Sequence, residues 1–150
     1  MSPINLDALC SDIKSRVGCS CDTYTEIGND QTLIIPAESL NEVIELLNER
    51  FHGVHLSAIT GQQRQDKTEK IELIYHFFEE DSFSFMFLLP ADDPVIPSIV
   101  GMIPGADFYE REAAEMFGVR FSGRQETPLL LLPDDWDQGP PFIRKEVDNE

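Results

Sequence analysis

Apolar residues near the N-terminus recur every three or four positions, which is the spacing of one face of an α-helix. Ser2 followed by Pro3 suits the start of such a helix, and Gly18 suits its end. The apolar stripe consists of Leu6, Leu9, Cys10, Ile13 and Val17. The sequence therefore predicts a helix between Pro3 and Gly18.

A second helical pattern follows Pro36 and is more regular than the first. Its apolar stripe consists of Leu40, Val43, Ile44, Leu47 and Phe51, and its acidic positions are Glu38, Glu42, Glu45 and Glu49. Gly53 is expected to end the helix. Because the acids avoid the apolar stripe, the pattern predicts a surface helix with one face on a core.

Alternation of apolar and polar residues predicts strands in several places. Asp22–Ile27 and Gln31–Ile35 flank a Gly-Asn-Asp turn and predict a β-hairpin. Three longer strands are expected over Val54–Thr60, Ile71–Phe78 and Phe83–Leu89. In the first of these, Val54, Leu56 and Ala58 are expected to share one face of the sheet.

Beyond Pro90 the pattern changes, because Pro94 and Pro97 interrupt regular structure. A short third helix is expected from about Phe108 to Phe117, with Asp107 and Glu110 at the spacing of a capping box. Gly118 is suited to end it. Four prolines follow, at positions 128, 133, 140 and 141, and they predict an extended tail.

These elements predict an α+β fold, with helices packed on a mostly antiparallel sheet, followed by a short helix and an extended C-terminal arm. In this division residues 1–123, with the helix 107–117, form the α+β domain, and residues 124–150 form the C-terminal arm. A long segment without regular structure is uncommon in a free-standing domain and indicates a function or a partner surface.

Length and charge narrow the class of protein. A chain of 150 residues is long enough for one core, and a net charge of −17 opposes binding to nucleic acid or to an anionic membrane. The charge could steer a basic partner or reflect a salt-adapted host. No signal-peptide pattern, no apolar run of about 20 residues and an odd number of cysteines predict a soluble chain in a reducing compartment.

Metal binding is a first candidate for chemistry. The candidate ligands are Cys10, Cys19, Cys21, His52, His55 and His76. Structural zinc normally requires two pairs of ligands, and here the single C-x-C has no second pair. Cys10 also fits the apolar stripe of the first helix. Ordinary packing is therefore favoured over a metal site.

Carboxylate catalysis is a second candidate, because Glu110, Glu112 and Glu115 crowd one helix. Glu110 and Glu112 are two residues apart and do not share a helix face. Arg111 is four residues from both Asp107 and Glu115 and can pair with either. Helix caps and solvated charges are favoured, and a stand-alone acidic hydrolase is the alternative. No G-x-G-x-x-G, P-loop or G-x-S-x-G motif is present.

The stretch 105–145 resembles the signature of the complex I 30 kDa subunit family, whose members are also called C subunits. The signature is an aromatic residue, E-R-E, an acidic residue, an apolar pair, Gly and F-x-G, followed by L-P-D-D-W and P-x-R-K. Its matching positions and the resulting candidate site residues are Tyr109, Glu110, Arg111, Glu112, Phe117, Gly118, Phe121, Trp136, Arg144 and Lys145. The resemblance extends from about Thr32 to Lys145.

One segment departs from this pattern. The respiratory enzymes usually carry G-H-P-D-L-R-R after the phenylalanine, whereas this chain has Gly123–Leu129 without the histidine or the paired arginines. The Glu115-Met116-Phe117 run and the Pro140-Pro141 pair look more like the archaeal and hydrogenase branches of the family.

The resemblance implies a non-catalytic structural subunit in the hydrophilic arm of a membrane-bound, ion-translocating oxidoreductase similar to NADH:quinone oxidoreductase. Such a subunit holds no cofactor, lies peripherally on the cytoplasmic side of the cell membrane, and positions two partners. One partner is the large catalytic subunit, either of the D type or of the hydrogenase type. The other is the B-type iron–sulfur subunit, and iron–sulfur clusters are expected in these partners. An energy-converting [NiFe] hydrogenase or a deazaflavin-dependent dehydrogenase is the alternative complex.

The resemblance also implies roles for single residues. Trp136 and Arg144 are expected to contact a partner, since Trp and Arg are favoured anchors at interfaces. Glu110, Arg111 and Glu112 are expected to hold the third helix against the C-terminal arm or a partner, without taking part in chemistry.

Overall fold

The computed structural model describes residues 5–24, 31–51, 54–64, 66, 68–79 and 81–143. It confirms the first helix as α1 (Leu6–Asp12), which continues as a π-helical turn, η1 (Ile13–Val17), and ends at Gly18. The expected cap at Ser2 is wrong for a helix that begins at Leu6. Asn5 is the N-cap, and its side chain accepts a hydrogen bond from the backbone N–H of Ala8.

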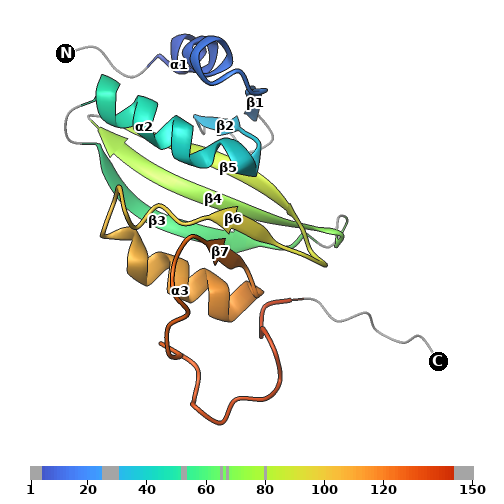
Figure 1. Ribbon diagram of the computed structural model, residues 1–150. Coiled ribbons are helices and arrows are strands. Elements are labelled where there is room, and N and C mark those ends of the chain that lie inside the picture. The colour runs from blue at the N-terminus through green and yellow to red at the C-terminus, as the bar shows by residue number, and fades with distance from the viewer. Residues whose placement is uncertain are drawn as a thin grey trace.

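A five-stranded sheet forms the centre of the described structure, in the order β1-β2-β5-β4-β3 (Figure 1). Its strands are β1 (Asp22–Tyr24), β2 (Thr32–Ile34), β3 (His55–Gln62), β4 (Lys70–Glu79) and β5 (Asp81–Pro90). Only the β2–β5 pair among them is parallel, which confirms the predicted mostly antiparallel sheet and the hairpin of β1 and β2. The Gly-Asn-Asp turn of that hairpin lies outside the described residues.

The predicted face of β3 is partly wrong. Its pairing register with β4 shifts between Leu56 and Ala58, as in a β-bulge. An extra residue in a strand reverses which side chains face the core. Leu56 and Ile59 are therefore the buried residues of β3, and Ala58 is only half-buried.

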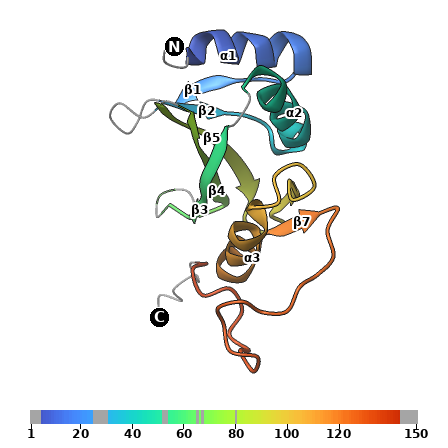
Figure 2. The ribbon, with the colours of Figure 1, turned by 90° about the vertical axis from the view of Figure 1, so that its left-hand side faces the viewer.

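One face of the sheet carries the core. A 3-10 turn, η2 (Ala37–Ser39), follows Pro36 and leads into α2 (Leu40–Arg50), whose apolar stripe packs on the aromatic residues of β4 and β5. The largest of these side chains, all buried, are Tyr75, Phe77, Phe83, Phe85 and Phe87. The helix ends at Arg50, and Gly53 lies outside the described residues. In Figure 2, α2 and β7 lie on the same side of the sheet.

A second structural unit covers the rest of this face. It consists of β6 (Val95–Pro97), α3 (Ala106–Phe117) and β7 (Arg120–Ser122), with β6 and β7 paired in parallel. The sequence did not predict these two strands, because Pro94 and Pro97 suggested irregular structure. A short ladder of this kind tolerates Pro97 because the proline stands at the end of an edge strand. The helix α3 packs against β3.

The start of α3 differs from the predicted capping box. Gly105 is the N-cap and makes no side-chain capping bond, and Asp107 already lies inside the helix. Gly118 ends α3 with a φ of 71°, as predicted. Among the described residues, no helix is both long enough and apolar enough to cross a lipid bilayer.

Candidate functional site

Glu110 lies at the centre of the region where α3 meets the C-terminal arm. Its side chain is fully buried. The Oε1 atom accepts a hydrogen bond from the backbone N–H of Ile99 at 2.8 Å, and Oε2 accepts one from Ser98 Oγ at 2.7 Å. Oε2 also accepts a bond from Nη1 of Arg124 at 2.9 Å. The expectation of a solvated or capping charge is therefore wrong for Glu110, because three donors satisfy it in the interior.

Arg124 is the cation that neutralises this buried carboxylate. Its Nη2 donates to Oδ1 of Asp107, so one guanidinium bridges two acids of α3. Burial by itself lowers the pKa of Arg124, but the hydrogen bonds to Asp107 and Glu110 outweigh it and raise the pKa above its usual value. Arg124 lies in the segment that departs from the family pattern, and it is not among the site residues that the sequence predicted. The sequence carries no local signal for its role, because the pair depends on the burial of Glu110.

Tyr75 of β4 lies beneath this cluster. Its hydroxyl is buried and has no hydrogen-bond partner among the described residues. Burial raises the pKa of Tyr75 well above its usual value, and the negative charge of Glu110 raises it further. The tyrosine thus stays neutral next to the Glu110–Arg124 pair.

The C-terminal arm is fastened to α3 by Glu115 and Arg111. The Glu115 carboxylate accepts hydrogen bonds from the consecutive backbone N–H groups of residues 130–132, including that of Leu131 at 2.8 Å. Arg111 donates Nη2 to the carbonyl oxygen of Pro128 at 3.1 Å. The expected pairs of Arg111 with Asp107 and Glu115 are replaced by these bonds, because both acids find partners in the arm.

The last part of the arm comes back to the C-terminal end of α3, where it contacts Phe117 and Gly118. The Phe117 ring lies edge-on to Phe142 with centroids 5.6 Å apart, and the backbone N–H of Phe142 donates to the carbonyl of Met116 at 3.0 Å. Gly61 of β3 lies against the Phe117 ring, where an added Cβ would be 2.7 Å from Cδ2 and Cε2. A Cβ added at Gly118 would lie 2.9 Å from Cγ of Pro140. The segment 124–143 forms neither helix nor strand, yet both of its ends are fixed.

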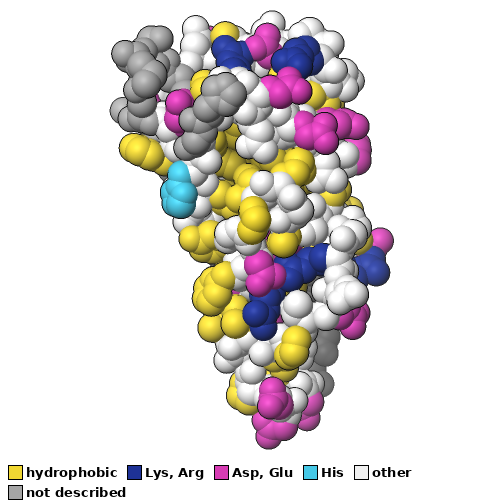
Figure 3. All heavy atoms as spheres, turned by 60° about the vertical axis from the view of Figure 1, so that its left-hand side comes forward, with side chains coloured by type: hydrophobic (Ala, Val, Ile, Leu, Met, Phe, Trp, Pro, Cys, Tyr) yellow, Lys and Arg dark blue, Asp and Glu magenta, His cyan; other side chains and the backbone are white. Residues whose placement is uncertain are grey.

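The outer side of the arm exposes apolar side chains. Those exposed by more than a third are Leu129, Leu131, Trp136 and Phe142. The indole Nε1 of Trp136 donates to the carbonyl of Gly139 at 2.7 Å, which fixes the ring against its own loop. In Figure 3 the lower part of the molecule, which holds α3 and the arm, presents hydrophobic side chains beside acidic and basic ones. An ordered apolar surface of this kind indicates an interaction site.

The remaining candidate residues lie on α3, on β7 and outside the described part of the chain. Tyr109 is half-buried on α3 and lies edge-on to Phe108, Glu112 is half-buried on the same helix, and Phe121 is half-buried in β7. Arg144 and Lys145 lie outside the described residues.

The same region does not form a carboxylate active site. A cleft between α3, β7 and the arm is lined by Glu110 and Glu115, whereas Glu112 does not line it. Glu110 is already occupied by Arg124 and two other donors, and Glu115 by the backbone of the arm. Glu126, the third carboxylate that lines the cleft, is exposed on the arm. A general acid or base must reach a substrate proton, so the geometry does not favour a hydrolase that uses these glutamates.

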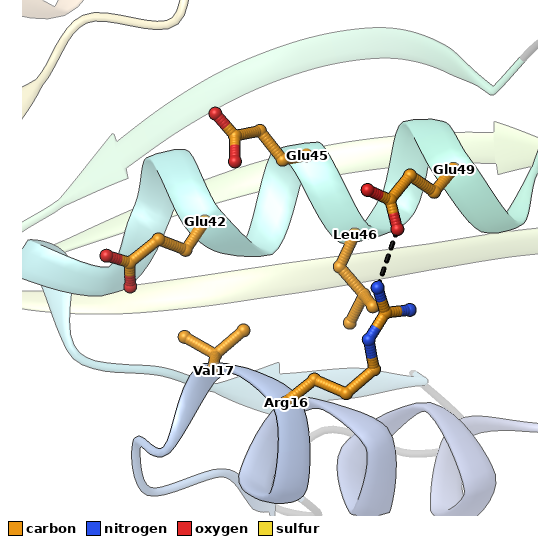
Figure 4. A pocket seen from close by; sticks show the side chains of 6 residues that line it. All are labelled: Arg16, Val17, Glu42, Glu45, Leu46 and Glu49. Carbon is orange, nitrogen blue, oxygen red and sulfur yellow. Dashed lines mark hydrogen bonds and ion pairs between the residues drawn. The ribbon is translucent and has the colours of Figure 1, made fainter.

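A second cleft, between η1 and α2, is lined by Arg16, Val17, Glu42, Glu45, Leu46 and Glu49 (Figure 4). Arg16 reaches across it to Glu49 at 2.6 Å, and both side chains are more than half exposed. Exposed pairs of this kind contribute roughly 0–1 kcal/mol to stability. The cleft offers surface charge and no arrangement suited to catalysis.

The candidate metal ligands that the structure describes do not form a metal site, although Cys10 and Cys21 lie close together. His76 of β4 hydrogen-bonds to Thr60 and Ser84 across the sheet, and His55 is exposed on β3. Within the described part of the chain, no three His, Cys, Asp or Glu side chains are placed to hold a metal ion. His52 lies outside that part.

Comparisons with known proteins identify relatives over most of the chain. Residues 33–150 match the family model of the respiratory-chain NADH dehydrogenase 30 kDa subunit. The NADH-quinone oxidoreductase C subunit of Roseiflexus sp. (strain RS-1) is 30% identical over 129 residues, which are 81% of this chain and 72% of the relative. The F(420)H(2) dehydrogenase C subunit of Methanosarcina mazei is 32% identical over 130 residues, which are 82% of each chain.

Two further matches are a longer relative and a solved structure. The NADH-quinone oxidoreductase C/D subunit of Methylococcus capsulatus is 33% identical over 127 residues, which are 77% of this chain but only 21% of that longer protein. Among solved structures, the trypsin-resistant fragment of Nqo5 aligns with a TM-score of 0.61 and 20% identity, covering 83% of this chain and all of that fragment. The α+β fold is thus shared with that fragment.

Proposed function

The chain belongs to the family of the respiratory-chain NADH dehydrogenase 30 kDa subunit, and from this premise we propose that it is a non-catalytic structural subunit of a membrane-bound, ion-translocating oxidoreductase. In this role it lies in the hydrophilic arm of the complex, peripheral to the membrane on the cytoplasmic side. It holds the large catalytic subunit and the iron–sulfur subunit in position. The iron–sulfur clusters belong to the partner subunits.

The observation that carries the proposal is the fixed but outward-facing C-terminal arm. Glu115 and Arg111 fasten the arm to α3, and Trp136 is fixed by its bond to Gly139. A segment ordered before binding loses little conformational entropy when a partner covers it. The apolar side chains on its outer side, Leu129, Leu131, Trp136 and Phe142, are then available to bury against another protein.

The occupied carboxylates support a structural role in place of a catalytic one. Glu110, Arg124 and Glu115 each make several internal contacts that link α3 to the arm or to the residues directly after β6. Groups used in this way position a surface and are not free to exchange protons with a substrate. The signature residues of α3 therefore serve to build the surface of the arm.

One relative supports a large catalytic subunit as the neighbour. The Methylococcus protein is named as a C/D subunit, and this chain matches about a fifth of its length. Two polypeptides that are separate in one organism and fused in another are expected to lie side by side. We therefore propose that the D-type large subunit, or its hydrogenase counterpart, lies against the chain. The B-type iron–sulfur subunit is the second partner of the proposal.

Another relative supports an alternative electron donor. The Methanosarcina mazei protein is named as the C subunit of an F(420)H(2) dehydrogenase, and its identity of 32% is similar to that of the NADH-quinone relatives. The alternative complex is therefore a deazaflavin-dependent dehydrogenase, or an energy-converting [NiFe] hydrogenase of the same family. In either complex the role of this chain is the same.

Affinity purification of the tagged chain from gently solubilised membranes tests the proposal. Recovery of an iron–sulfur subunit and a large catalytic subunit would support it, and the metal ligands of the large subunit would distinguish hydrogenase from dehydrogenase. A chain that is recovered alone from membranes, and that turns over a substrate in a way that Glu112→Gln abolishes, would refute it.

A further inference from the structure

The N-terminal layer contains three cysteines that the family match does not include, since that match begins at residue 33. Cys10 lies in α1, Cys21 directly precedes β1, and Cys19 lies two residues earlier. Cys10 and Cys21 are buried, whereas Cys19 is half-buried. The proposed structural role of the chain assigns nothing to them.

Cys10 and Cys21 are held against each other. The Sγ of Cys10 donates a hydrogen bond to the carbonyl oxygen of Cys21 at 3.0 Å, and Cys10 is close enough to the Cys21 thiol to raise its pKa. Residues in α1 and at the start of the sheet are thereby joined through a sulfur contact. This contact brings the two cysteines to the close range that a disulfide requires.

A surface cleft opens over this pair. Both cysteines line it, together with Asp7, Lys14 and Asp22 among others. A reagent that enters this cleft therefore lies next to both cysteine residues. The ammonium group of Lys14 favours the negative charge of a thiolate or of an anionic reagent in this cleft.

The environment of Cys21 determines which of the two cysteines reacts first. Burial, and secondarily the contact with Cys10, raise the pKa of the Cys21 thiol far above its usual value. The thiolate is the attacking form of cysteine, so Cys21 is a poor first nucleophile. It can still close a bond to a neighbouring sulfur that is already activated as a mixed disulfide.

We propose that Cys10 and Cys21 form a dithiol modification site that small-molecule disulfides, such as oxidised glutathione, convert into an intrachain disulfide between α1 and the start of β1. In the first step the Cys10 thiolate attacks the reagent disulfide, forms a mixed disulfide and releases one thiolate of the reagent. In the second step Cys21 loses its proton to solvent and attacks the Cys10 sulfur, releasing the other thiolate. Two protein thiols are oxidised and one reagent disulfide is reduced to two thiols.

The test uses the full-length chain with Cys19→Ser, so that the half-buried third cysteine cannot react. The probe is oxidised glutathione under anaerobic conditions, followed by intact mass and by peptide mapping without reduction. We expect a chain that has lost two hydrogen atoms, with the peptides of Cys10 and Cys21 joined. The rate of bond closure is expected to rise about tenfold per pH unit, following the thiolate fraction of Cys21.

Two single variants in the same background separate the steps. Cys21→Ser is expected to accumulate one glutathione on Cys10, whereas Cys10→Ser is expected to stay unmodified. The cross-link itself is read on a chain with both cysteines intact, so the result does not depend on how well these variants fold. A chain that keeps two free thiols, or that holds glutathione without closing the bond, would overturn the proposal, and neither result bears on assembly of the complex.

Discussion

The guanidinium of Arg124 lies 2.9 Å from the Glu110 carboxylate, which is completely shielded from solvent. Arg124 belongs to the C-terminal arm, whereas Glu110 belongs to the middle of α3. The first residues of the arm therefore neutralise a charge in the interior. Because an unpaired buried charge is costly, the arm and the core are energetically coupled.

Replacing Arg124 with methionine is expected to destabilise the chain strongly. The variant leaves Glu110 buried without its cation, and breaking a buried pair in this way costs about 3–5 kcal/mol. Urea unfolding followed by tryptophan fluorescence measures the change. Arg120→Met is the matched control, because Arg120 pairs with Asp93 where both side chains are about two-thirds exposed, and such pairs contribute roughly 0–1 kcal/mol.

Removing the charges of both Glu110 and Arg124 is a second test of this coupling. The double variant Glu110→Gln, Arg124→Met is expected to be more stable than Arg124→Met alone, because no uncompensated charge remains. If the double variant is less stable by the sum of the two single changes, the two residues act independently and the coupling is refuted.

Tyr75 is expected to make the fold sensitive to alkaline pH. Its pKa in the folded chain is raised well above the value of about 10 that an unfolded tyrosine has. The contribution of Tyr75 to the free energy of unfolding is fully present below pH 10. It is lost as the pH rises beyond 10, because the unfolded chain then releases a proton that the folded chain keeps. The slope approaches about 1.4 kcal/mol per pH unit.

Urea unfolding at several values above pH 10 measures this slope. In Tyr75→Phe the slope is expected to lose the contribution of one proton. Stability at neutral pH should not fall, since the hydroxyl has no hydrogen-bond partner among the described residues. Tyr109→Phe is the control, because it keeps Tyr75. An unchanged slope in Tyr75→Phe would contradict the assignment.

The periodic spacing of apolar residues made much of the fold predictable. The features that the sequence did not predict depend on contacts between residues far apart in the chain. The stripe of α2 and the alternating aromatic residues of β4 and β5 indicated their elements directly, because each buries one face on the same core. The β-bulge at Leu56 has no comparable signal, since it depends on pairing with β4. The strands β6 and β7 are three residues each, and their pairing joins two segments that α3 separates along the chain.

The candidate site was predictable only in its location. The family signature indicated α3 and the arm, and the helical pattern around Gly118 predicted where α3 ends. The spacing along the helix suggested that Arg111 would pair with Asp107 or Glu115. In the structure it donates a hydrogen bond to the carbonyl of Pro128 instead. The role of Arg124 depends on the burial of Glu110, and burial in the interior of a fold is not encoded by neighbouring residues in the sequence.

Gly61 and Phe117 fix the distance between β3 and α3. A Cβ at position 61 would lie 2.7 Å from the Phe117 ring, which is also held by Phe142 on the arm. Gly61→Ala is therefore expected to lower the free energy of unfolding by about 1–3 kcal/mol, the usual cost of overpacking. A second substitution, Phe117→Leu, should recover part of the loss if the clash with the ring is the cause. No recovery in a thermal or urea measurement would point to another cause.

Glu115 is expected to control the order of the arm with little effect on the core. Glu115→Gln loses the charge that binds the N–H groups of residues 130–132, and hydrogen bonds to charged groups contribute about 1.5–3 kcal/mol. Proteolysis within the arm should accelerate by about tenfold for each 1.4 kcal/mol of lost local stability. Glu112→Gln is the matched control on the same helix. Equal acceleration in both variants would show that Glu115 does not hold the arm.

Trp136→Ala is expected to impair assembly of the complex far more than it affects folding. The indole is partly exposed, and its only described hydrogen bond, to Gly139, lies within its own loop, so loss of unfolding free energy should stay near 1 kcal/mol. A buried interface tryptophan commonly contributes about 2 kcal/mol or more to binding, which corresponds to a fall of about thirtyfold in affinity. Co-purification of the partner subunits with the tagged variant measures the effect. Leu88→Ala, an exposed apolar residue on the sheet away from the arm, is the control, and equal recovery of partners with both variants would refute the arm as the interface.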